Sequence, residues 1–198
     1  MNDIYFSHQN CSLPKCSSVL EPYDSTYLTA SIRDSFIAAK LGSIGVCTLG
    51  SQLKIYWANA LFSDADRAFN KRCAEELRSV GYEVFLPQET PFTFDEAPSN
   101  EEIYEADSEA ILRSDVLVAC IDQFPIDAGV ACEIGVASNA QIPIIALYTD
   151  IRAKRKGPGK MYKNQYVLGA IEKHGMMVHS VDSLLDTLRE IQSSLTSK

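Results

Sequence analysis

Residues 114–135 read SDVLVACIDQFPIDAGVACEIG, and this stretch decides the fold. The run Val116–Ile121 is apolar throughout, which is typical of a strand that is buried on both faces. A short acidic loop follows, and a helix is expected over Gly129–Ala140. A buried strand that leads into a helix in this way is one βα unit of a parallel sheet.

The same alternation of short apolar runs and amphipathic segments extends over the chain from Leu53 onward. Four further strands are expected at Lys54–Ala58, Glu83–Leu86, Pro143–Leu147 and Met177–His179. Further helices are expected from Ser63 to Val80, from Ser99 to about Arg113, within Tyr162–Lys173 and over Val181–Leu195. Ser63 with Asp66, and Ser99 with Glu102, have the spacing of helix N-terminal caps.

These elements predict an α/β fold with a doubly wound, five-stranded parallel sheet of the flavodoxin-like or Rossmann-like kind. Ligands of such sheets bind beyond the carboxyl ends of the strands. Functional residues are therefore expected in the loops that follow the strands. We take residues 53–198 as this α/β domain.

Residues 1–52 differ in composition from the rest of the chain. They are rich in Ser, Tyr and Cys and contain few charges and no clear strand. Within them, the segment Leu28–Leu41 places its apolar residues near one helical face, and Gly42 is a stop signal. We expect an N-terminal extension of unknown role, with one helix that packs on the core.

The composition is that of an ordinary soluble globular protein, with 46% apolar and 22% charged residues among 198. A net charge of −8 opposes binding to a nucleic acid polymer or to an anionic membrane surface. The chain starts Met1-Asn2-Asp3 without a secretory signal pattern, and it has no apolar stretch of about 20 residues. We expect a cytoplasmic protein that binds a small ligand.

The sequence lacks two recognisable patterns, that of a zinc site and that of a phosphate-binding P-loop. The six cysteines include no C-x-x-C pair and no His at the spacing of a zinc site, so free thiols are expected. Gly159-Lys160 is followed by Met161, whereas a phosphate-binding P-loop needs Ser or Thr there.

Two blocks of like charge interrupt the chain. The segment Gln88–Leu112 holds eight acidic residues and no basic one, and Arg152–Lys163 holds six basic residues and no acidic one. We interpret both first as solvated loops. A gating loop or pairing across subunits is the alternative.

Three carboxyl groups lie near the expected crevice. Asp127 occupies the position of a helix N-cap, and Glu133 follows in the second turn on the same face as Gly129, whose missing side chain leaves room. The helix dipole favours an ionised carboxylate there, as a nucleophile requires. Asp107 lies on the preceding helix, two turns before Asp115, and paired carboxyl groups suit glycosyl chemistry.

A structural interpretation of the same residues remains open. In that interpretation Asp127 is only an N-cap, Glu133 is a helix residue with a surface partner, and Asp107 belongs to an acidic helix face. Residue spacing alone does not separate the two interpretations.

Four patterns together resemble the nucleoside 2-deoxyribosyltransferases: I-Y-x-A followed by Phe, S-D-x-x-V-A, D-x-G-x-x-x-E-x-G-x-A and T-D-x-R. The matching residues are Ile55, Tyr56, Ala58, Phe62, Ser114, Asp115, Val118, Ala119, Asp127, Gly129, Glu133, Gly135, Ala137, Thr149, Asp150 and Arg152. They cover residues 53 to about 170, and their order is more specific than any one motif.

The resemblance implies transfer of a 2-deoxyribosyl group between nucleobases through a covalent intermediate on Glu133, with retention at C1′. Asp107 or Asp127 would protonate the departing base, and Tyr56 would orient Glu133. The implied partners are a deoxynucleoside and a free nucleobase. No metal and no other cofactor is implied.

Further residues receive expected roles from the resemblance. Phe62 would contact the base, and Gln88 could meet its edge. Asn164 would reach the sugar 5′-hydroxyl in a neighbouring subunit, which implies a homo-oligomer with shared active sites. Asn59 stands where family members often have Gly-Pro or small residues, so it adds a polar group near the base and leaves purine or pyrimidine preference open. Asp115 is expected to tie the start of its strand.

Two other functions compete with the transferase. A hydrolase would pass the same intermediate to water, with deoxynucleosides or deoxynucleoside 5′-monophosphates as substrates. The basic Arg152–Lys163 block could then contact the phosphate. A non-catalytic nucleotide-binding module would use the same fold without turnover, because fold alone does not fix function.

Overall fold

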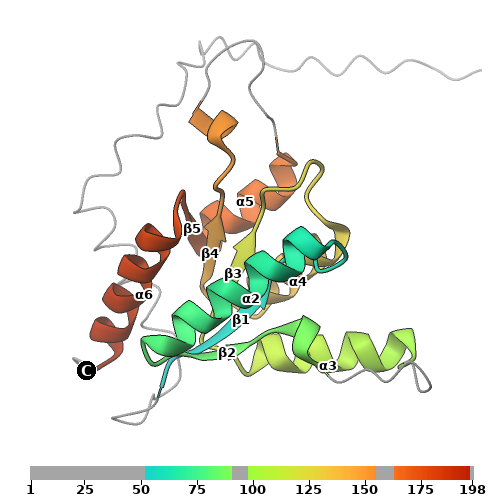
Figure 1. The fold of residues 1–198 in the computed structure, drawn as a ribbon, viewed down its shortest axis with the longest axis horizontal. Helices are drawn as coiled ribbons and strands as arrows, with labels where there is room; N and C mark the ends of the chain where they lie inside the picture. Colours follow the sequence, from blue (N-terminus) through green and yellow to red (C-terminus); the bar gives the residue numbers. More distant parts are fainter. Residues whose placement is uncertain (1–51, 91–97, 155–162, 197–198) are drawn as a thin grey trace, which may run out of the picture.

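The computed structural model describes residues 52–90, 98–154 and 163–196. Five strands form one parallel sheet in the order β2-β1-β3-β4-β5 (Figure 1). They are β1 (Lys54–Ala58), β2 (Glu83–Phe85), β3 (Val116–Cys120), β4 (Ile144–Leu147) and β5 (Gly175–Val178). The predicted doubly wound, five-stranded parallel sheet is confirmed. The helix predicted over Leu28–Leu41 lies outside the described residues.

Within the described residues, five α-helices and two short 3-10 helices join or flank the strands. They are α2 (Asp64–Ser79), η1 (Pro87–Glu89), α3 (Asn100–Leu112), α4 (Ala128–Asn139), η2 (Ile151–Lys154), α5 (Gln165–His174) and α6 (Val181–Thr196). Ser63 caps α2 by accepting a hydrogen bond from the Asp66 amide. Ser99 and Glu102 form the predicted capping box of α3. Local sequence signals therefore start these helices where they were expected.

Helices cover both faces of the sheet because successive side chains of a strand point to opposite faces. Ile55 and Trp57 of β1 pack with α2 and α6, whereas Tyr56 and Ala58 pack with α3, α4 and α5. All four side chains are at most 1% exposed. Each of these four residues thus belongs to one of two separate cores, and among them only Tyr56 brings a hydroxyl group to the α4 side.

The last strand begins two residues before the predicted Met177–His179, at Gly175. A Cβ atom at Gly175 would overlap the main-chain carbonyl of Ile144 in β4. The backbones of β4 and β5 approach so closely that residue 175 must be glycine. The start of this strand was missed because a glycine at the end of a helix is a weak signal for a strand. The other strand ends agree with expectation to within one residue.

The sheet order reverses between β1 and β3, which places a crevice at the carboxyl ends of these two strands. The loops that begin at Asn59 and at Ile121 border this crevice. Among the described residues, no helix is long and apolar enough to cross a membrane.

Candidate active site

Tyr56 and Glu133 meet at this edge of the sheet. Tyr56 lies in β1 and Glu133 in the second turn of α4, and the Tyr56 hydroxyl donates a hydrogen bond to Glu133 Oε1 at 2.7 Å. Tyr56 is fully buried, and Glu133 is partly buried. The expectation that Tyr56 orients Glu133 thus has a direct geometric basis.

The environment of Glu133 holds its carboxyl group near the midpoint of its titration at neutral pH. Burial is the main cause that raises the pKa of Glu133, and the hydrogen bond from Tyr56 opposes part of this rise. The nearby Asp107 and Asp127 carboxyl groups also raise it, and the resulting pKa is about 7. A carboxyl group with this pKa is available as a carboxylate and also able to accept a proton near neutral pH.

Asp107, on α3, is the second titratable group of the cluster. Burial raises the pKa of Asp107, and the nearby Tyr56 hydroxyl acts in the opposite direction. Burial and the neighbouring Glu133 and Asp107 carboxylates raise the pKa of Tyr56 strongly. Tyr56 therefore remains a neutral phenol, able to donate to Glu133 and to interact with Asp107.

Asp127 has the predicted position of the α4 N-cap. Its Oδ1 atom accepts from the amides of Gly129, at 2.9 Å, and Val130, at 3.2 Å. A Cβ atom added to Gly129 would lie 3.1 Å from the same oxygen. A side chain at position 129 would therefore crowd the capping oxygen of Asp127, whereas the expected room beside Glu133 stays a prediction.

Asn59 and Gln88, the two amide residues expected near the base, are joined by Asn70, a residue that the sequence analysis missed. Asn70 of α2 is 1% exposed and bonds to both Asn59 and Gln88. Asn70 was readable as a polar residue on the buried face of α2, three and four positions before Cys73 and Ala74.

Phe62 and Asn164 are exposed and take no part in the Tyr56–Glu133 cluster. The Phe62 side chain is 83% exposed in the loop before α2. The Asn164 side chain caps α5 by accepting hydrogen bonds from the amides of Tyr166 and Val167. The expected contacts of Phe62 with a base and of Asn164 with a neighbouring site stay predictions.

Asp115 is structural, as expected. Its carboxylate accepts a hydrogen bond from the Lys54 amide at 2.8 Å, and its own amide donates to the Lys54 carbonyl at 2.9 Å. The two bonds join the beginnings of β1 and β3.

The T-D-x-R motif is also explained by local structure. The Thr149 amide and hydroxyl both donate to the Asp122 carboxylate after β3. Asp150 pairs with Arg152, and hydrogen bonds from Arg152 lower the pKa of Asp150 to about 2. The motif therefore joins the ends of β3 and β4.

Lys163 departs from the expected solvated basic block. It is 7% exposed, and its Nζ donates to the main-chain carbonyls of Asp122 and Gln123 at 3.1 and 2.7 Å. Nζ also lies 4.8 Å from the centroid of the Tyr148 ring. Lys163 anchors the loop after β3, a role that its place in a run of basic residues did not indicate.

Comparison with known proteins places these residues in a family context. The family model described as nucleoside 2-deoxyribosyltransferase matches residues 55–188. No curated protein matches the sequence significantly.

Among solved structures, a conserved protein from Enterococcus faecalis V583 is 36% identical, with a TM-score of 0.66 over 71% of this chain and 99% of that one. A 2-deoxyribosyltransferase from Bacillus psychrosaccharolyticus is 22% identical, with a TM-score of 0.51 over 66% and 89%. The CMP N-glycosidase BcmB of Clostridium botulinum is 18% identical, with a TM-score of 0.46 over 69% and 97%.

The hydrogen bond between Tyr56 and Glu133 leads to a test of the site's electrostatics. Tyr56→Phe removes a donor that favours the ionised carboxylate, so the pKa of Glu133 should rise above 7 by about one unit. Less of Glu133 is then ionised at pH 7. Carbon-13 NMR titration of the glutamate carboxyl groups measures this, with Glu133→Gln to assign the signal.

Tyr148→Phe is the matched control, because the Tyr148 hydroxyl has no hydrogen-bond partner among the described residues. This variant should leave the Glu133 titration unchanged. An unchanged or lower pKa of Glu133 in Tyr56→Phe would contradict the account of the site.

Proposed function

The chain belongs to the nucleoside 2-deoxyribosyltransferase family, and from that premise we propose that it transfers a 2-deoxyribosyl group between nucleobases. The observation that carries the proposal is the hydrogen bond between Tyr56 and Glu133, beside the Asp107 and Asp127 carboxyl groups. This arrangement supplies an oriented nucleophile and a nearby acid, as glycosyl transfer with retention requires.

In the first step, a Glu133 carboxylate oxygen attacks C1′ of the deoxynucleoside. The bond between C1′ and the base nitrogen breaks, and its electron pair leaves with the base. A protonated carboxyl group donates its proton to the departing base. Tyr56 holds Oε1 of Glu133, so Oε2 is the oxygen that attacks.

Asp107 is the better candidate for the acid. Burial raises its pKa, which favours the protonated form that can donate. Oδ1 of Asp127 already accepts two amide hydrogen bonds at the start of α4. We assign protonation of the base to Asp107, and the capping of the helix that carries Glu133 to Asp127.

In the second step, a nitrogen of the incoming base attacks C1′ and displaces Glu133. The proton that this nitrogen loses returns to Asp107. Two displacements restore the original configuration at C1′. Water in place of the base would give free deoxyribose, so the hydrolase differs from the transferase only in the group that accepts the sugar.

The base is proposed to bind between Phe62 and the polar residues after β1 and β2. The exposed Phe62 ring offers a stacking surface. Asn59 and Gln88 lie beyond the carboxyl ends of β1 and β2, on the same edge as Glu133. The sugar is proposed to lie beside Gly129, where a side chain would crowd Asp127 Oδ1.

The full chain is tested by incubation with one deoxynucleoside and a different free base, without added metal or cofactor, followed by chromatography. We expect the exchanged nucleoside to appear. Glu133→Gln should lower the rate by at least about a thousandfold, because it replaces the nucleophile with a neutral isostere. Cys132→Ser, on the neighbouring exposed position of α4, is the matched control and should keep the rate.

Release of free base without exchanged nucleoside would support the hydrolase instead. Ligand binding without any turnover would support the non-catalytic module. Full activity in Glu133→Gln would rule out Glu133 as the nucleophile.

Asn164 is proposed to complete the site of a neighbouring subunit. Its Oδ1 caps α5, which leaves its amide nitrogen to donate outward to a sugar hydroxyl. Asn164→Asp keeps a good N-cap but replaces this donor with an oxygen, so we expect low activity without loss of the helix. Mixed with Glu133→Gln subunits under exchanging conditions, it should form some sites with both native residues and regain activity.

Activity that stays at the level of the separate variants, despite demonstrated subunit exchange, would show that Asn164 does not serve a neighbouring site.

A further inference from the structure

A network of side-chain amides crosses the carboxyl edge of the sheet, with Asn70 at its centre. Asn70 Oδ1 accepts from Trp57 Nε1 at 3.0 Å and from Asn59 Nδ2 at 2.6 Å. Asn70 Nδ2 donates to the Ala60 carbonyl and to Gln88 Oε1, each at 3.0 Å. Both hydrogens of the Asn70 amide, and both acceptor positions of its oxygen, are therefore used.

The ends of the network fix the direction of every bond in it. The Trp57 indole N–H can only donate, so the oxygen of Asn70 must face it. The Ala60 carbonyl can only accept, so the nitrogen of Asn70 must face that group. Rotation of the Asn70 amide by half a turn would set donor against donor and acceptor against acceptor.

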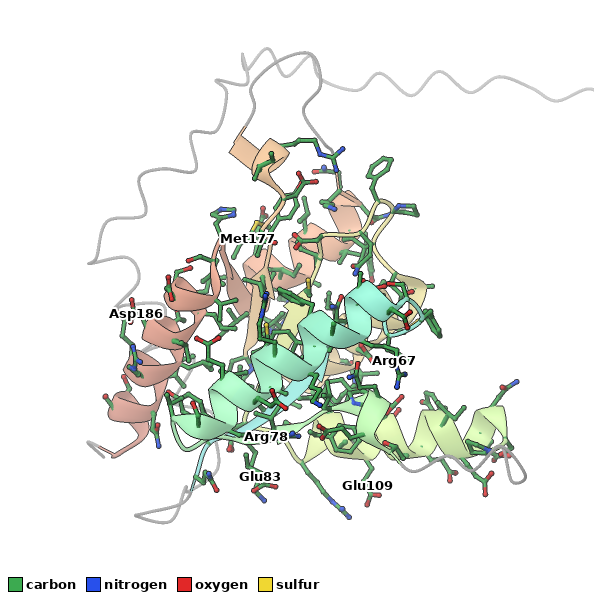
Figure 2. All side chains as sticks on the ribbon, in the orientation of Figure 1. Arg67, Arg78, Glu83, Glu109, Met177 and Asp186 are labelled. Carbon is green, nitrogen blue, oxygen red and sulfur yellow. The ribbon has the colours of Figure 1, made fainter. Side chains whose placement is uncertain are left out.

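The orientation of the Asn70 amide also fixes that of Gln88. Gln88 Oε1 faces the donor nitrogen of Asn70, and Gln88 Nε2 donates to the main-chain carbonyl of Arg67 at 3.0 Å. Arg67 is labelled on α2 in Figure 2. The Gln88 amide is thus held at both ends, with its oxygen inward. Its second N–H has no partner among the described residues, and the side chain is partly exposed.

Asn70 also orients Asn59. Its Nδ2 donates to Asn70, and its Oδ1 accepts from Gln123 Nε2 at 2.7 Å. Asn59 follows β1 and Gln123 lies in the loop after β3, so this bond spans the point where the sheet order reverses. Asn59 is only 8% exposed, which leaves Gln88 as the better exposed member on the β2 side.

We propose that Asn70 is a positioning residue that determines specificity. It turns the free N–H of Gln88 outward, so that Gln88 selects nucleobases with a hydrogen-bond acceptor at the edge that faces it. This inference rests on the proposed function, because it needs a base in the crevice. Asn70 itself touches no substrate. It acts through Gln88, whose amide would otherwise be held only by the bond from Nε2 to the Arg67 carbonyl.

The test compares bases that differ in one acceptor. Adenine is compared with its 1-deaza, 3-deaza and 7-deaza analogues as sugar acceptors, each of which replaces one ring nitrogen by C–H. For a wild type that accepts only pyrimidines, cytosine is compared with 3-deazacytosine and 2-thiocytosine. We expect kcat/KM of the wild type to fall roughly threefold to tenfold for one analogue, which corresponds to one neutral hydrogen bond.

Asn70→Asp reverses the direction of the bond to Gln88. A carboxylate still accepts from Trp57 and Asn59, but it presents an oxygen to Gln88 Oε1. A hydrogen bond to this charged acceptor is stronger than the one that Gln88 Nε2 makes to the neutral Arg67 carbonyl, so the Gln88 amide turns and offers its carbonyl to the base. The penalty for the sensitive analogue should then shrink to about onefold. Because this penalty is a ratio within one variant, a loss of folded protein cancels from it.

Lys71→Gln is the matched control, since it makes the same change in net charge at the next, exposed position of α2. Its penalty should equal that of the wild type. Gln88→Glu removes the donor without altering Asn70 and should also abolish the penalty, even if Asn70→Asp does not fold. Emission from Trp57, the only tryptophan in the chain, reports whether each variant keeps its core.

The inference is overturned if the wild type transfers sugar but accepts every analogue equally. It is also overturned if Gln88→Glu, or a folded Asn70→Asp, keeps the wild-type penalty, because Asn70 would then have a structural role only. Failure of the wild type to transfer sugar to any base would instead refute the proposed function, and this inference with it.

Discussion

The hydrogen bond from Tyr56 to Glu133 is the interaction on which the rest of the site depends. It joins β1 to the helix that follows β3, and it sets which carboxylate oxygen is free. It also keeps the pKa of a partly buried acid near 7, in a place where burial and two neighbouring carboxyl groups push it upward. Without this donor, Glu133 would be more fully protonated at neutral pH and a weaker nucleophile.

The alternation of side chains along β1 divides the chemistry of the site in two. Tyr56 faces the helices that carry the titratable carboxyl groups Asp107 and Glu133, whereas Trp57 faces α2 and its neutral amide Asn70. Charge is thus concentrated on the side where the glycosidic bond is proposed to break. The other side has fixed hydrogen bonds without net charge, which suits discrimination between bases.

The features that the sequence predicted correctly are those that depend on short-range patterns. Apolar runs located the strands, capping residues located the helix starts, and the position of Asp127 before α4 identified the N-cap that leads to Glu133. Side-chain partners far apart in the chain were not predictable in the same way. The role of Asn70 depends on Trp57 and Gln88, and the burial of Lys163 depends on two carbonyl groups some 40 residues away.

Identification of the covalent intermediate tests the central claim most directly. The full chain is incubated with a deoxynucleoside in the absence of an acceptor base, quenched in acid, digested and analysed by tandem mass spectrometry. We expect one added 2-deoxyribosyl group, located on the carboxyl group of Glu133. A deoxyribosyl group on any other residue of the turning-over protein would contradict it.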